Sequence, residues 1–399
     1  TRVPKRPSCA KSHPNPGNVF APCWNHLRLT LPAVVCSDPD SGNAEWEQDG
    51  EPCTSRNQMR GSVRKNACWQ RLAAGLAILA LASGLSDISA AATTDIFAAG
   101  VTAAGTSTPD STTVILLGTG NPRPSPERAG PATAIMVGDR LFLFDAGPCV
   151  MRQLAAAKLS IKGAEAVFLT HLHTDHTLGY PDLIFTSWVM GRQRSMPVYG
   201  PPGLAAMTDH LLAAWSEDIE IRTNGLERET PGGYRVDVHE IRLPTPADSV
   251  ATAISRTRVV YDSAGVRVTA IPVPHGNWKH AYGFRIDTPD RSIVLSGDTA
   301  YSPLLLEMSR GVDVLIHEVY PEVRLKPEPR PGGELWVQYM KEFHTSDVEV
   351  GRLAAAARPK LLLLHHVVWM GGVEEELIQG ISQGGYSGPV VIGADLGRY

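Results

Sequence analysis

One short segment, Thr170-His171-Leu172-His173-Thr174-Asp175-His176, constrains this chain more than any other. It places three imidazoles and one carboxylate within six residues, directly after the apolar run 166–170. Such a run predicts a buried strand, so the donors lie on a loop at the strand's C-terminal end. A solvated loop rarely needs so many donors, and a core would not accept them unpaired. The segment therefore predicts a metal site, with a plain surface cluster of histidines as the alternative.

The donor types and their spacing indicate which ions fit. Imidazole nitrogens and carboxylate oxygens suit Zn²⁺, and imidazole also suits iron or nickel. Alternate residues of an extended segment point the same way, so His171 and His173 share one direction. Asp175 and His176 can then reach a second ion nearby. Only Cys149 follows residue 92, and no Cys-x-x-Cys occurs, so the site relies on His and carboxylates.

Apolar runs alternate with helical patterns along the later part of the chain. Amphipathic stretches predict helices at 150–158, 203–215 and 346–357, the last capped by Thr345 or Ser346. Strands and helices in this order predict an α/β fold with covered sheets. The strands are predicted from short apolar runs bounded by turn residues, at 113–117, 132–137, 141–144, 166–170, 197–199, 266–271, 283–286, 292–295, 312–316 and 360–364.

The first 111 residues follow a different pattern. From Met59, a basic stretch, an apolar run of 14 residues (72–85) and small residues follow one another, as in a secretory signal peptide. The run is short for a membrane span, and a buried helix or an anchor is the alternative. We therefore predict a non-native upstream or disordered segment at 1–58, a signal peptide at 59–92 and a linker at 93–111. The protein is then periplasmic or secreted, with no transmembrane anchor in the mature chain.

Further stretches share the pattern of one known family. The donor segment has the form His-x-His-x-Asp-His, and on it the chain resembles the metallo-β-lactamase superfamily over residues 112–399. Within that superfamily it is most similar to the ribonuclease Z-like or arylsulfatase-like branch. The resemblance implies an αβ/βα four-layer sandwich with metals at one edge. The other matching stretches are LLGTGNPRPSPERAG (116–130), FDAG (144–147), YGPPGL (199–204), IPVPHGNWKHAYGFRI (271–286), LSGDT (295–299), LIHE (315–318), FHTS (343–346) and KLLLLH (360–365).

The resemblance also implies roles for individual residues. Asp145 is expected to buttress the metal loop without binding metal, and His344 to assist the leaving group. His317 and Glu318 are either structural or orient a ligand by hydrogen bond. The implied ligands of two Zn²⁺ ions (Mn²⁺ or iron being alternatives) are His171, His173 and His275 for one ion, Asp175, His176 and His365 for the other, and Asp298 as the bridge.

Two of these assignments require a choice between neighbouring histidines. His275 directly follows a predicted strand, which is the usual ligand position, whereas His280 lines the pocket or faces solvent. His365 and His366 point to opposite sides of a strand, so only one of them can face the metal. The match to KLLLLH favours His365.

Charge bears on the substrate. Residues 93–399 contain 27 Lys and Arg against 34 Asp and Glu, whereas binding a phosphate backbone needs clustered basic residues. The segment between residues 204 and 260 carries an acidic insert, WSEDIEIRTNGLERETPGG, and no basic Gly- and Pro-rich arm. We therefore expect a small-molecule ester or diester as the substrate and rank nucleic acid below it. A homodimer is expected only because the branch often dimerises.

The leading functional prediction is a dinuclear zinc hydrolase of the phosphodiesterase type, acting through a metal-bridging hydroxide. Asp175 or Asp298 is expected to orient that hydroxide. His344 is expected to protonate the departing oxygen as a general acid. Arylsulfatase, lactonase and β-lactamase are the alternative activities, and a metal-containing binding module is the alternative to an enzyme.

Overall fold

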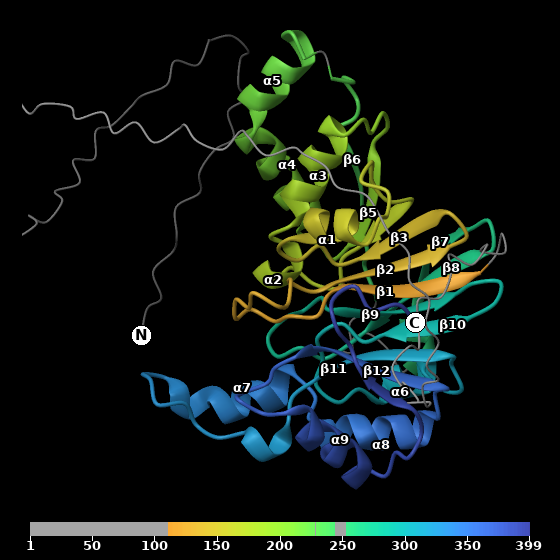
Figure 1. The fold of residues 1–399 in the computed structure, drawn as a ribbon, viewed down its shortest axis with the longest axis vertical. Coiled ribbons are helices and arrows are strands. Elements are labelled where there is room, and N and C mark those ends of the chain that lie inside the picture. Colours follow the sequence, from red (N-terminus) through yellow and green to blue (C-terminus); the bar gives the residue numbers. More distant parts are fainter. Residues whose placement is uncertain (1–110, 228, 244–252) are drawn as a thin grey trace, which may run out of the picture. The chain divides into compact units, whose positions relative to one another are not determined.

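The computed structural model describes residues 111–227, 229–243 and 253–399 (Figure 1). The predictions for segments 1–58 and 59–92, and for all of 93–111 except Ser111, lie outside these residues. Within the described ranges, no helix combines the length and the apolar character needed to cross a membrane.

The first of two sheets has six strands in chain order. The first three strands pair antiparallel, and the last four, from β3 onward, pair parallel. Its strands are β1 (Thr112–Gly118), β2 (Ala132–Val137), β3 (Arg140–Phe144), β4 (Ala166–Phe168), β5 (Met196–Gly200) and β6 (Val236–Glu240).

The second sheet has seven strands in the order β13-β12-β11-β10-β9-β8-β7. Strands β10 to β13 pair parallel, whereas β7, β8, β9 and β10 pair antiparallel in turn. Its strands are β7 (Arg258–Ser263), β8 (Val266–Pro272), β9 (Tyr282–Asp287), β10 (Ser292–Leu295), β11 (Val314–Val319), β12 (Leu361–Val367) and β13 (Val390–Ile392).

The two sheets pack face to face over an apolar core. Its centre is aromatic: the Phe144 and Phe168 rings stack with centroids 4.9 Å apart, and Phe284 of the second sheet lies 5.7 Å from each. Alternate residues of each strand face this core, as the pleat requires. Burial of such large side chains is the main favourable term in docking the sheets.

Helices cover the outer faces of both sheets, so the fold has four layers. In Figure 1, α1, α3 and α4 lie on one side of the paired sheets and α6, α8 and α9 on the other. The predicted αβ/βα sandwich is therefore confirmed. The helices are α1 (Val150–Ala156), α2 (Thr174–Thr177), α3 (Tyr180–Val189), α4 (Leu204–Ala214), α5 (Ser216–Asn224), α6 (Pro303–Met308), α7 (Trp336–Phe343), α8 (Asp347–Ala357) and α9 (Glu374–Gln383), with single 3₁₀ turns at Ala253–Arg256, Glu322–Arg324 and Gly333–Leu335.

Strand direction gathers the predicted donors at one edge. Parallel strands end at the same edge of a sheet, and polar sites form there. The donor motif follows β4, and Asp298 follows β10. Strand β8 runs parallel to β10, because both pair antiparallel with β9, so His275 emerges at that edge too. The short turn between α7 and α8 adds His344, and Ser346 caps α8 through a capping box with Glu349.

Candidate metal centre

A carboxylate behind the donor motif holds it in place. Oδ1 of Asp145 accepts the backbone N–H of Thr170 at 2.8 Å. Its Oδ2 accepts the Nδ1–H of His176, also at 2.8 Å. That bond fixes the tautomer of His176 and leaves Nε2 free to bind a metal, an arrangement common around metal sites. Asp145 is not a member of either donor group described below. It contacts the motif from behind, which is the buttressing role expected of it.

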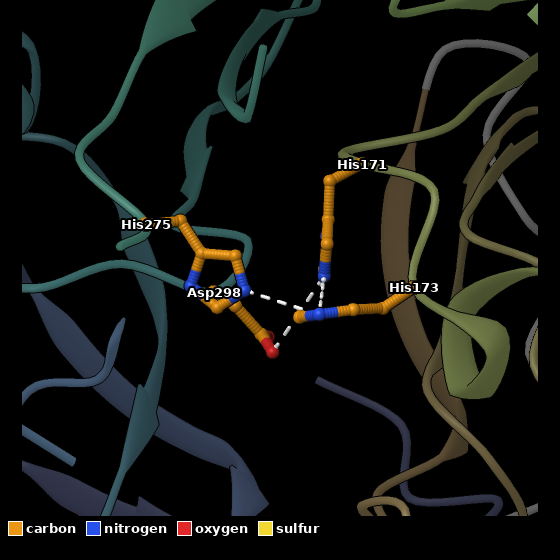
Figure 2. A group of neighbouring side chains, drawn as sticks. All are labelled: His171, His173, His275 and Asp298. Atoms are coloured by element: carbon orange, nitrogen blue, oxygen red, sulfur yellow. Dashed lines mark hydrogen bonds and ion pairs between the residues drawn. The ribbon is translucent and has the colours of Figure 1, made fainter. Parts of the chain in front are cut away.

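The first donor group consists of His171, His173, His275 and Asp298, whose side chains point toward one another in Figure 2. Nδ1 of His173 lies 2.9 Å from Nε2 of His171 and 3.1 Å from Nε2 of His275. An Asp298 oxygen lies 3.9 Å from Nε2 of His171. Donors around a tetrahedral zinc ion with bonds of about 2.0–2.1 Å stand roughly 3.4 Å apart, so the spacing fits such an ion.

Two contacts orient members of this group. His275 donates Nδ1–H to the backbone oxygen of Phe343 at 2.7 Å, which leaves its Nε2 facing the other donors. The indole nitrogen of Trp278 lies 2.8 Å from Nε2 of His173. His280 is in neither donor group, so the structure places His275, as predicted, at the cluster.

The second donor group consists of Asp175, His176 and His366. Nε2 of His366 lies 3.2 Å from Oδ2 of Asp175, and Nε2 of His176 lies 3.6 Å from the same oxygen. Asp298 reaches this group as well, with one oxygen 3.3 Å from His176 and the other 3.4 Å from His366. Its carboxylate therefore lies between the two groups, where a bridging ligand belongs.

The electrostatics of the cluster suit divalent cations. Burial lowers the pKa of His173 and of His275 to about 4, so both rings are neutral and have a lone pair to give. Burial alone would also lower the pKa of His366, but Asp298 and the hydrogen bond to Asp175 outweigh it and raise the pKa to about 9. Without an ion, protons on His366 and His176 thus balance the buried carboxylates. A metal ion supplies the same charge, and its binding releases those protons.

One predicted ligand is corrected. The structure places His366, and not His365, beside Asp175 and Asp298. The two strands fall out of register between Glu318 and Val319, where His366 is the extra residue of β12, with a left-handed φ of 45°. This bulge turns His366 toward the cluster, whereas the match to KLLLLH had favoured His365. The buried ring of His365 has no hydrogen-bond partner among the described residues.

Because His366, and not His365, lies in the second donor group, we expect substitutions of these two adjacent histidines to have different effects. His366→Ala is expected to lower the zinc content by about one ion per chain, because it removes a donor of the second group. His365→Gln is expected to keep the full content. Elemental analysis of both variants after dialysis against equal free zinc checks this. The reverse pattern would restore His365 as the ligand.

A second prediction concerns Asp145. An asparagine amide keeps the size of the carboxylate but removes its charge, so Asp145→Asn is expected to weaken zinc binding about 10- to 100-fold. Competition with a chromogenic chelator measures that affinity. Asp290→Asn is the matched control, because Asp290 bonds Thr112 and not the cluster. Equal affinities in the two variants would contradict the buttressing role.

His344 and Glu318 form a buried pair beside the cluster. Nδ1 of His344 lies 2.9 Å from a Glu318 oxygen, and the other oxygen accepts the backbone N–H of Thr299 at 2.8 Å. A His344 ring nitrogen lies within 4.8 Å of donor atoms of Asp298 and His366. Burial raises the pKa of Glu318 well above its usual range and lowers that of His344 to about 4. Both shifts favour the uncharged forms, so one proton is held between the Glu318 carboxyl and Nδ1 of His344.

The contact between Glu318 and His344 was not predicted from the sequence. His317 and Glu318 were predicted to be structural or to orient a metal ligand. Instead, Glu318 holds His344, whereas His317 donates Nδ1–H to the Glu318 backbone oxygen and belongs to no donor group. The sequence did carry a signal for this contact: Glu318 places a carboxylate at the end of a predicted strand, at the same edge as the donor motif.

The chain was compared with protein families and curated proteins. Residues 140–367 match the family described as "Beta-lactamase superfamily domain". "Ribonuclease Z" of Mycobacterium bovis (strain BCG / Pasteur 1173P2) is 33% identical over 291 residues, which cover 71% of this chain and 96% of that protein. "Ribonuclease Z" of Mycobacterium sp. (strain KMS) is 34% identical over 258 residues, which cover 63% of this chain and 83% of that protein.

Solved structures share the fold. The metallo-beta-lactamase fold protein YhfI from Bacillus subtilis has a TM-score of 0.54 and 20% identity, covering 73% of this chain and 99% of that one. Human tRNase Z, short form, has a TM-score of 0.53 and 22% identity, covering 72% of this chain and 98% of that one. At these identities the likeness concerns the arrangement of sheets and helices.

Proposed function

Because the chain belongs to the ribonuclease Z-like branch of the metallo-β-lactamase superfamily and is a metal-dependent hydrolase, we propose that it is a dinuclear zinc phosphodiesterase. The observation that supports this most is the position of Asp298 between two donor groups. Each group offers imidazoles and a carboxylate, the donor set that zinc prefers. The short distances between donors also fit ions that they share. Oδ1 of Asp298 and Nε2 of His176 lie 3.3 Å apart, and both atoms are buried with no other hydrogen-bond partner among the described residues.

The residues proposed to hold the ions follow from these groups. Asp298 would contribute one carboxylate oxygen to each ion. His366 takes the place first predicted for His365. The remaining ligands would be His171, His173 and His275 for one ion, and Asp175 and His176 for the other.

Two bound divalent ions would lower the pKa of a water and offset charge on the attacking and leaving oxygens. The protein's own part is to hold the phosphodiester in line with that water and to exclude competing solvent. Asp175 and Asp298 accept hydrogen bonds and so orient the attacking water. Both are buried, which keeps their geometry fixed.

The His344–Glu318 pair would supply the proton for the leaving oxygen. His344 carries a proton on Nε2 and lies next to the donor groups, within reach of a substrate bound there. As that proton leaves, Nδ1 accepts the proton that Glu318 donates, so the imidazole stays neutral and the negative charge is left on the Glu318 carboxylate, which the backbone N–H of Thr299 helps to stabilise. General acids placed in this way contribute about 10²- to 10⁴-fold to rate.

The substrate is proposed to be a small phosphodiester rather than RNA. Residues 93–399 carry more acidic than basic groups. Helix α5 lies in the acidic insert and buries none of its residues. An exposed helix with Glu217, Asp218 and Glu220 would repel a phosphate backbone.

Hydrolysis of bis-p-nitrophenyl phosphate by the zinc-loaded full chain tests this proposal, with p-nitrophenyl sulfate measured beside it. We expect phosphodiester turnover that a chelator removes and added zinc restores. Turnover of the sulfate alone would identify an arylsulfatase instead. Turnover of neither would contradict the proposal and direct the search to lactones and β-lactams.

We also propose that the protein is exported, since residues 59–92 have the order of a signal peptide. N-terminal sequencing of the natively expressed protein is then expected to give a start near residue 93. A mature start upstream of Met59 would contradict both the export signal and the non-native origin of residues 1–58.

A further inference from the structure

A cavity of about 380 Å³ opens beside the first donor group. Five apolar side chains line it, from four separate parts of the chain. We call it the apolar pocket, and its apolar walls are Leu172, Pro201, Pro202, Trp278 and Phe343. None of these side chains would bind an ion or move a proton in the mechanism proposed above.

The apolar pocket adjoins the donors directly. Leu172 lies between His171 and His173 in the chain. The Trp278 indole touches His173, and the Phe343 ring has its centroid 5.1 Å from that of His275. A substrate held at the first donor group therefore has this cavity within reach of one of its substituents.

The chemistry of the walls indicates what that substituent is. Two aromatic rings and two prolines offer flat apolar surface, which favours an aryl ring or a short alkyl chain. The exposed Lys279 borders the cavity and is free to pair with an anionic phosphate. Its volume of about 380 Å³ lies at the lower end of the range for small-molecule sites, so it has room for such a group.

A second cavity, at the start of α7, mixes charged and apolar side chains. Its lining includes Arg123, Arg324 and Arg330 beside Trp336 and Met370. The arginines are already paired: Arg123 and Arg330 with Glu328, and Arg324 with Glu376. The apolar pocket has no arginine in its lining and borders the first donor group, so it is the better place for an apolar substituent.

We propose that the apolar pocket binds one aryl or short-alkyl ester arm of the substrate, so that the preferred substrates are phosphodiesters with at least one apolar arm. The part of this inference that concerns the reaction rests on the proposed function. The part that concerns binding of the apolar arm does not. Transfer of a phenyl group from water into such a pocket, compared with a methyl group, is expected to tighten binding about tenfold or more.

Binding is tested apart from turnover. Calorimetry compares phenylphosphonate with methylphosphonate on the zinc-loaded full chain, and kinetics compares phenyl p-nitrophenyl phosphate with methyl p-nitrophenyl phosphate. Pro202→Glu places a carboxylate in the apolar wall, and Pro202→Ala is the milder variant if the first unfolds. Ile378→Glu, at a 42% exposed residue of α9, is the matched control. Thermal unfolding checks that each variant is folded.

We expect wild type and Ile378→Glu to prefer the phenyl compounds about tenfold or more. Pro202→Glu is expected to abolish that preference, and Pro202→Ala to reduce it, while the methyl compounds are affected little. An equal affinity for both phosphonates in wild type, or a preference that survives in Pro202→Glu, would overturn the inference. If wild type prefers phenylphosphonate but hydrolyses neither diester, the result would support binding of an apolar group in the pocket and contradict the proposed phosphodiesterase activity.

Discussion

Asp298→Ala is expected to abolish zinc-dependent phosphodiester hydrolysis and to lower the zinc content of the chain below one ion. The reason is the position of this carboxylate, which reaches both donor groups. One of its oxygens lies 3.3 Å from His176, and the other lies 3.4 Å from His366 and 3.9 Å from His171. Among the described residues, no other carboxylate lies within 4 Å of both His171 and His366.

The expected loss in kcat/KM is on the order of 10³-fold or more, because metal ions provide several kcal/mol of transition-state stabilisation. Initial rates at saturating free zinc and elemental analysis measure the two effects. Asp313→Ala is the matched control, since Asp313 pairs with Lys360 and Ser292 outside the cluster. An Asp298→Ala protein that keeps both its zinc and its rate would refute the bridging role.

His344→Asn is expected to lower kcat about 10²- to 10⁴-fold while zinc content and KM change little. The side chain lies beside the donor groups, and Glu318 buries and orients it. A proton donor matters most when the leaving group is a poor one. The loss should therefore be small for a p-nitrophenyl leaving group and large for an unactivated alcohol.

A series of diesters with leaving groups of different pKa measures this dependence. Glu318→Gln is expected to show the same trend with a smaller loss, because the amide can still bond Nδ1 but cannot pass a proton to it. His210→Asn, on the exposed surface of α4, is the control. A loss that is equal for all leaving groups would point to a structural role for His344 and not to proton donation.

Local pattern was enough to predict most strands of the two sheets and the donor motif, whereas the edge strands β6, β7 and β13 were not predicted. Strands such as β1, β4 and β10 are short apolar runs bounded by turn residues, and that signal survives in any tertiary context. The helix at α8 was marked by its cap at Ser346. The motif at 171–176 needs no partner elsewhere in the chain to be recognised as a set of metal donors.

The missed features depend on contacts between distant segments. The bulge at His366 arises where β12 pairs with β11, and nothing in the letters His-His indicates which ring turns inward. Glu318 and His344 are 26 residues apart and meet only because β11 and the α7–α8 turn end at the same edge. Helix α5 has no buried residue, so it lacks the apolar periodicity by which helices are recognised.

The donors come from both sheets, and this arrangement affects how the protein matures. His171 and His176 follow a strand of the first sheet, whereas His275 and Asp298 follow strands of the second sheet and His366 lies within its strand β12. Neither half alone offers a full set of ligands for either ion. A metal ion that needs donors from both halves would be captured only after the halves have docked, so metal uptake would come last in assembly. Bound metal would then stabilise the docked state by mass action, and the lifetime of the folded protein would depend on the metal supply around it.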